Sequence, residues 1–108
     1  MNKICTSIEQ SQKLIKLGID VNTADMCWQN NEFPIGFNDD DAVPAWSLAA
    51  LLNVLPEGMI ENYYAPNLQK EEGKYSIAYG NEKLLCIADN PIDCCVKMII
   101  KLNELKLL

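Results

Sequence analysis

Histidine and arginine are both missing from this chain of 108 residues, because all nine of its basic residues are lysines. Without histidine, the chain has no imidazole that could serve as a general base, activate a serine or cysteine nucleophile, or ligate a metal. Without arginine, it has no guanidinium fork for bidentate recognition of phosphate or carboxylate. The chain therefore lacks two of the most versatile functional side chains.

Positive charge, long apolar runs and a regular cysteine spacing are also lacking. Fifteen acidic residues give a net charge of −6, and the dispersed lysines form no basic patch for nucleic acid. No stretch approaches the roughly 18 apolar residues of a membrane span, and the first residues contain no signal-peptide core. The five cysteines are odd in number and two are adjacent, which is a poor disulfide framework. We expect a cytoplasmic protein that binds neither nucleic acid directly nor a membrane.

What is present is the composition of an ordinary globular domain. Hydrophobic residues make up 49% of the chain and charged residues 22%. The length falls within the usual size of one domain. We expect a single domain over residues 1–108, either a monomer or a weak homodimer, that folds without a metal or a disulfide.

The first helix is predicted over residues 7–17. Thr6 and Glu9 have the spacing of a capping box, in which each side chain accepts from a free backbone N–H at the helix start. Gly18 supplies the left-handed residue that commonly ends a helix. At about 100° per residue, Ile15 falls on the apolar side, so we expect it to face the core.

Two further helices are predicted from their caps and apolar spacing. Ser47 is a suitable N-cap for a strongly apolar helix over residues 47–55. Asn90, followed by proline at the first helical position, begins a helix over residues 91–105.

Between the helices lie segments typical of antiparallel strands. Two short runs form a predicted hairpin, and three runs separated by glycine-containing turns form a predicted three-stranded meander. The fold class is therefore α+β, an antiparallel sheet with three helices packed on one face. A single five-stranded sheet is our first expectation, and two smaller sheets are the alternative. The predicted strands are 26–29 and 33–37 in the hairpin, and 67–70, 74–79 and 83–88 in the meander.

The cysteines do not have the spacing of a metal site, because no Cys-x-x-Cys pair and no histidine is present. We therefore expect reduced thiols that act as small hydrophobic side chains. On the last predicted helix, Cys95 falls on the apolar face, while Cys94 lies about 100° away beside Lys97. The helical projection predicts that Cys95 is buried and Cys94 is accessible.

The acidic loop Asp39, Asp40 and Asp41 fails the EF-hand calcium template. Counted from Asp39, the sixth and twelfth positions hold Pro44 and Ala50 instead of glycine and glutamate. A solvated loop is the better interpretation. Its carboxylates could contact a partner protein.

The pair Tyr63 and Tyr64 lies between the second helix and the meander, where we expect at least one ring to face water. Exposed aromatic side chains beside acidic residues are common at protein interfaces. Together with the three aspartates, these tyrosines are the candidate partner-binding residues. No catalytic, cofactor-binding or metal-binding residue is assigned, and no cofactor is expected.

Three segments together resemble a family of small proteins without an assigned activity, encoded on prophages and mobile elements of gut bacteria of the Bacteroides type. The resemblance implies an α+β fold and a bacterial or phage-borne setting, and it carries no ligand or catalytic residue. The segments are Thr23-Ala24-Asp25-Met26, Pro44-Ala45-Trp46-Ser47-Leu48 continuing to Leu55-Pro56, and Asn90-Pro91-Ile92-Asp93 with Met98-Ile99-Ile100 and Leu102.

The missing catalytic side chains favour a small non-enzymatic protein that binds or regulates another protein. An acidic inhibitor that mimics DNA is the alternative, although the acids here fall mostly in turns instead of along one face. An enzyme with unrecognised aspartate or cysteine chemistry is the third possibility.

Overall fold

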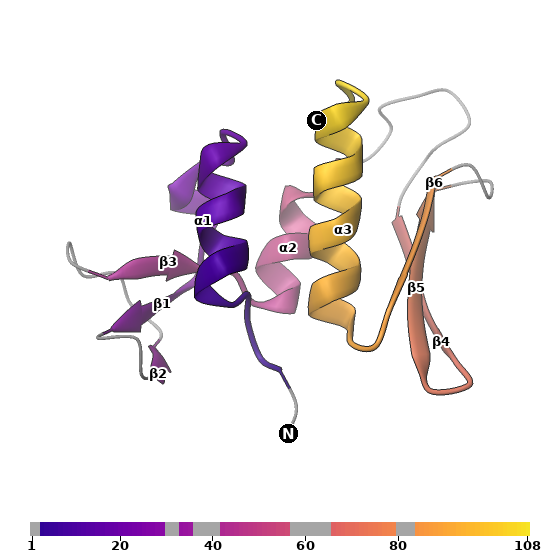
Figure 1. The fold of residues 1–108 in the computed structure, drawn as a ribbon, viewed down its shortest axis with the longest axis horizontal. Coiled ribbons are helices and arrows are strands. Elements are labelled where there is room, and N and C mark those ends of the chain that lie inside the picture. The colour runs from indigo at the N-terminus through magenta and orange to yellow at the C-terminus, as the bar shows by residue number, and fades with distance from the viewer. Residues whose placement is uncertain (1–2, 30–32, 36–41, 57–65, 80–83) are drawn as a thin grey trace.

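The structure is a computed structural model that describes residues 3–29, 33–35, 42–56, 66–79 and 84–108. In this part of the chain, three helices lie between two small antiparallel sheets (Figure 1), so the α+β class is confirmed. No helix among the described residues is long and apolar enough to cross a membrane. The elements are α1 Ile8–Lys16, the 3₁₀ turn η1 Val21–Thr23, β1 Met26–Gln29, β2 Phe33–Ile35, β3 Val43–Ala45, α2 Leu48–Val54, β4 Pro66–Glu71, β5 Lys74–Tyr79, β6 Leu84–Ala88 and α3 Pro91–Glu104.

Helix α1 has the predicted bounds to within a residue, but its capping box is shifted by one position. The N-cap is Ser7, whose hydroxyl accepts from the backbone N–H of Gln10, and the Gln10 side chain accepts in turn from the Ser7 N–H. The predicted pair Thr6 and Glu9 is therefore wrong. Thr6 is unavailable because its hydroxyl, completely buried, accepts instead from the backbone N–H of Trp46.

The N-caps predicted for the other two helices are confirmed. The Ser47 hydroxyl accepts from the backbone N–H of Ala50 at the start of α2. At the start of α3, the Asn90 side chain accepts from the N–H of Asp93 at 2.8 Å, and Pro91 is the first helical residue. Each cap satisfies a backbone donor that has no partner inside its helix.

The strands form two sheets instead of the single five-stranded sheet that we favoured, so that expectation is wrong and the alternative of two smaller sheets is confirmed. The predicted meander is present in the order β4-β5-β6. The predicted hairpin is also present as β1 and β2, with Trp28 opposite Pro34. A third strand, β3, extends this sheet in the order β2-β1-β3. It contains Pro44, which is tolerated because β3 lies at an edge of the sheet.

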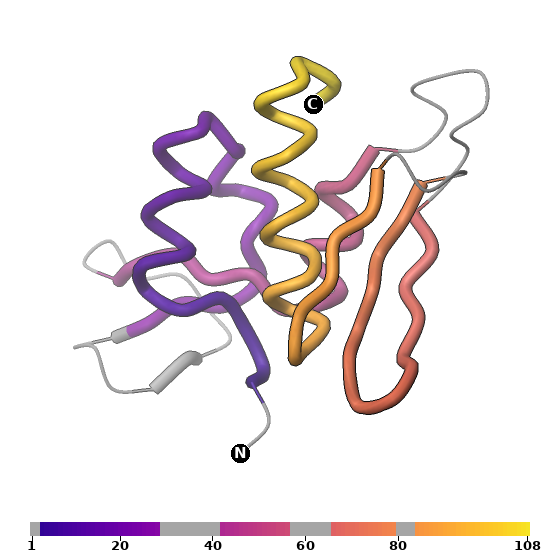
Figure 2. Tube along the Cα trace, turned by 45° about the vertical axis from the view of Figure 1, so that its right-hand side comes forward, coloured from indigo at the N-terminus to yellow at the C-terminus, as the bar shows by residue number. Residues whose placement is uncertain are grey.

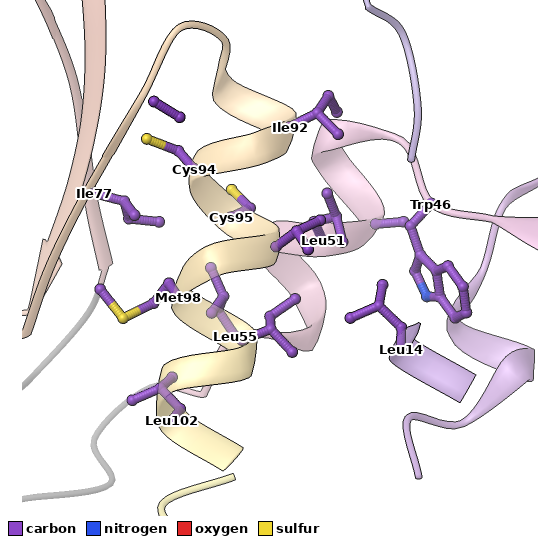
Figure 3. Packing of buried hydrophobic residues seen from close by; sticks show 14 of the residues in the cluster. Leu14, Trp46, Leu51, Leu55, Ile77, Ile92, Cys94, Cys95, Met98 and Leu102 are labelled. Atoms are coloured by element: carbon purple, nitrogen blue, oxygen red, sulfur yellow. The ribbon is translucent and has the colours of Figure 1, made fainter. Parts of the chain in front are cut away.

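Helix α3 is the centre of the hydrophobic core. Strands β5 and β6 pack against it, as Figure 2 shows, and α2 packs on another side. In Figure 3, Ile77 of β5 and Leu51 of α2 approach α3 from these two directions. Seven of its residues are buried: Ile92, Cys94, Cys95, Val96, Met98, Ile99 and Leu102.

The inward face of α1 differs from the predicted one. Ile15 is 38% exposed, whereas Ser11 and Leu14 are completely buried. Ser11 faces inward because its hydroxyl forms a 2.7 Å hydrogen bond with the hydroxyl of Thr6. A polar partner in the interior therefore sets the rotation of this helix, and apolar spacing alone could not show it.

Helices α1 and α3 end in the same way with different residues. Beyond α1, Gly18 has a φ of +94°, with hydrogen bonds from its own N–H to Ile15 and from the Ile19 N–H to Leu14. Beyond α3, Lys106 takes the equivalent position with a φ of +60°. Both ends match the Schellman motif, in which glycine is the favoured left-handed residue. Lysine there is strained.

The two helix ends provide a matched pair of predictions. Lys106→Gly should raise the free energy of unfolding by about 1 kcal/mol, because it removes the strain of a side chain at positive φ. Gly18→Ala should lower it by about the same amount, since a Cβ there meets no atom within 4 Å and only the backbone is strained. Urea denaturation of both variants checks these values. Lys106→Ala is the control for loss of charge, and an equal gain in that variant would contradict the explanation.

Candidate functional site

The candidate partner-binding residues predicted from the sequence lie outside the described part of the chain. These are Asp39, Asp40, Asp41, Tyr63 and Tyr64. Their role in binding stays a prediction.

The thiols of α3 are both buried, so the predicted accessibility of Cys94 is wrong. Cys94 and Cys95 are each 0% exposed. The Cys94 thiol lies within 3.0 Å of the backbone oxygen of Tyr75, because the meander covers this side of the helix. In Figure 3, Cys94 lies on the side of Ile77, and Cys95 is closer to Leu51.

Burial keeps these thiols protonated. It raises the pKa of Cys94, and it raises the pKa of Cys95 to about 12. Burial also raises the pKa of the half-buried Cys86, although Lys101 and Lys97 act in the opposite direction. A thiol is nucleophilic only as the thiolate, so these three are poor nucleophiles at neutral pH. No group of three or more potential metal ligands occurs among the described residues.

The carboxylate of Asp93 joins the start of α3 to α1 and the N-terminal segment. One carboxylate oxygen of Asp93 accepts from Lys3 Nζ at 2.7 Å and from Gln10 Nε2 at 2.8 Å, and the other accepts from the Asn90 side chain at 2.8 Å. Partial burial is the largest single influence and raises the pKa of Asp93, but the three hydrogen bonds and the Lys3 charge outweigh it. The pKa of Asp93 is therefore lowered. This carboxylate connects three segments of the fold and suits a structural role.

The described surface has a different kind of feature at strand β6. In the order β4-β5-β6, this strand pairs only with β5 among the described residues, so it forms an edge of the sheet. Its side chains alternate: Leu84 and Ala88 are buried, whereas Leu85 is 38% and Ile87 53% exposed. An edge strand with exposed apolar side chains is a site where another strand can pair.

Lysines of α3 lie beside this edge. Lys97 Nζ donates to the backbone oxygen of Ile87 at 2.9 Å. Lys101, one turn later on α3, lies close enough to Cys86 to affect its thiol electrostatically, as Lys97 does. The edge therefore combines two exposed apolar side chains with two positive charges.

The opposite edge of the meander, strand β4, has a different character. It begins with Pro66, which has no N–H to donate, and Asn67 and Gln69 are exposed polar side chains. Proline and polar side chains discourage strand pairing at an edge. The two edges of one sheet therefore differ, and β6 is the one suited to binding. Sequence reasoning missed β6 because it could not show which strands lie at the edges.

No protein-family model, curated protein or solved structure matches this chain.

Residues in the segments that carry the resemblance position the start of α2 by hydrogen bonds. The indole N–H of Trp46 donates to the Thr23 hydroxyl at 2.9 Å. The Asp25 carboxylate accepts from both the backbone N–H and the hydroxyl of Ser47. These contacts hold the N-cap of α2 against the segment before β1. These residues therefore have structural roles, and the resemblance and the mobile-element origin stay predictions.

Thiol labelling tests the packing of α3. In the folded protein, a maleimide should modify Cys86 well before Cys94 or Cys95, because only Cys86 is partly exposed among these three. Labelling of Cys86 should accelerate with rising pH, since its pKa is raised and little thiolate exists at neutral pH. Peptide mass spectrometry measures each rate, with the urea-unfolded protein as the reference. Early modification of Cys94 would show that the meander does not cover α3.

The Asp93 carboxylate predicts a pH-dependent contribution to stability. A lowered pKa in the folded state means that the contribution is complete above the unfolded pKa and is lost as the pH falls through the folded pKa. Asp93→Asn should therefore lower the free energy of unfolding at pH 7 by about 1 kcal/mol, allowing for partial exposure. The gap between the variant and the parent protein should close in acid.

Urea denaturation across the pH range measures this gap. The control is Glu9→Gln, which removes an exposed carboxylate that has no ion pair among the described residues. An Asp93→Asn gap that stays constant from pH 7 into the acid range would contradict the role given to the charge.

Proposed function

We propose that this chain is a small, non-enzymatic protein-binding module and that the free edge of β6 is its docking element. The exposure of Leu85 and Ile87 on an edge strand is the observation that carries the proposal. An extended segment of a partner can pair with the backbone of such a strand while its side chains cover the apolar ones, a common mode of peptide recognition.

The chemistry of the described residues supports binding over catalysis. The Asp93 carboxylate is occupied by three hydrogen bonds inside the fold. The thiols of Cys94 and Cys95 are buried and have raised pKa values. Asp93, Cys94 and Cys95 therefore have structural roles.

A regulatory role in the cytoplasm and an origin on a phage or mobile element are parts of the same proposal. Cys5, Cys86, Cys94 and Cys95 form no disulfide, as is usual in a reducing compartment. The resemblance in sequence supports the origin.

A random peptide library displayed on phage tests the proposed function. The immobilised protein should enrich extended peptides. The double variant Leu85→Lys with Ile87→Lys should lose at least tenfold in affinity for them, because it places charge where an apolar side chain must be covered. The matched control on the other edge is Asn67→Lys with Gln69→Lys, which should bind as the parent protein does.

Circular dichroism and a thermal melt show that both double variants remain folded. Enriched peptides that bind the β6 variant as tightly as the parent protein would overturn the proposal. Failure to enrich any peptide would overturn it as well.

A further inference from the structure

We infer that the segment that docks on β6 alternates apolar and acidic side chains, with its carboxylates on the side of α3. This inference rests on the proposed function and names the chemistry of the partner. It follows from the different surroundings of the two faces of the sheet at this edge.

The outer face requires apolar side chains in the partner. Leu85 and Ile87 lie on this face, and their cross-strand neighbours on β5 are the small residues Ala78 and Ser76. Small neighbours leave the two larger side chains uncovered on that side, which explains their exposure. An open depression of the surface also borders Ile87 and Ser76. Apolar side chains on an added strand would lie next to Leu85 and Ile87 and remove them from water.

The inner face requires carboxylates. Side chains of successive residues on a strand point to opposite faces, so those that alternate with the apolar ones face α3. Lys97 and Lys101 lie there, and neither has an ion pair among the described residues, where the salt bridges involve Lys3 and Lys74. Lys97 donates to the Ile87 oxygen, which an added strand would supply with a backbone N–H instead. The displaced ammonium group would then be available to a carboxylate.

A second copy of this chain fits the edge poorly. Antiparallel pairing of β6 with its own copy would place both α3 helices on the same face of the joined sheet. The Lys97 and Lys101 side chains of the two copies would then meet across the junction, and like charges at an interface oppose association. The net charge of −6 repels an acidic partner at long range, and beyond a Debye length of about 8 Å this repulsion is screened. A short acidic segment therefore fits better than a wholly acidic protein.

Three synthetic octapeptides test the inference. In each, valine alternates with a second residue, which is glutamate, glutamine or lysine. Fluorescence anisotropy of the fluorescein-labelled peptides measures Kd for the full chain. The glutamate peptide should bind about tenfold more tightly than the glutamine peptide, as expected for two partly exposed ion pairs, and the lysine peptide should bind most weakly.

A second experiment removes the positive charges from the protein instead of changing the peptide. Lys97→Met with Lys101→Met should abolish the preference for glutamate over glutamine. The matched control is Lys13→Met with Lys16→Met, which removes two exposed lysines from α1 and should leave the preference unchanged. A fourth peptide, with its four valines and four glutamates in separate blocks, has the same composition and should bind at least tenfold more weakly, because only alternation places the carboxylates on one face.

The outcomes separate the two proposals. If the valine peptides bind at β6 with equal affinity, or if the α3 variant keeps the preference, the acidic partner is wrong and the docking edge stands. If no peptide binds here and none is enriched from the library, the docking edge itself is wrong. Equal binding of the block peptide would overturn strand addition. A dimer in analytical ultracentrifugation that Ile87→Lys dissociates would show that a second copy is the occupant.

Discussion

The burial of α3 on two sides, against the meander and against α2, is the constraint on which the rest of the structure depends. Its N-terminal half places Cys94 against the backbone of β5, while Leu51 of α2 lies on the other side (Figure 3). A helix in this position must be apolar around most of its circumference, and seven of its residues are buried. Burying a side chain of the size of Met98 or Ile99 contributes about 1.5–3 kcal/mol. The meander and α2 are therefore joined mainly through α3.

The sheet formed by β1, β2 and β3 is held to this core by hydrogen bonds that converge on Thr6. Its N–H donates to the Trp46 oxygen, its hydroxyl accepts from the Trp46 N–H, and its carbonyl accepts from the indole of Trp28. The hydroxyl also bonds Ser11 of α1. A buried threonine is tolerated only when its polar atoms are paired, and here that pairing connects α1 to β1 and to the segment after β3. Hydrogen bonds therefore attach this sheet to the core, whereas apolar packing against α3 attaches the meander.

These two arrangements explain how far the sequence could predict the structure. Helix ends were predicted well where the signal is local, as at Ser47 and Asn90. The capping box predicted at Thr6 is one position too early, because Thr6 and Ser7 both carry a hydroxyl. Only the fold shows that the Thr6 hydroxyl accepts from the backbone N–H of Trp46. Cys94 was misjudged because an amphipathic projection assumes one buried face, whereas α3 has two. The sequence shows local features such as helix caps. It does not show how many other elements pack against each helix or strand.

The β6 edge depends on the same non-local information, since no property of its five residues shows which side lacks a strand partner among the described residues. Once the fold is known, Lys97 has two opposing effects there. Its ammonium group occupies the Ile87 oxygen, and charged side chains at an edge discourage uncontrolled pairing of strands. The same charge favours a partner that carries a carboxylate, because that partner gains an ion pair when it displaces the lysine. One side chain at this edge can therefore oppose pairing with a second copy and favour a partner that carries a carboxylate.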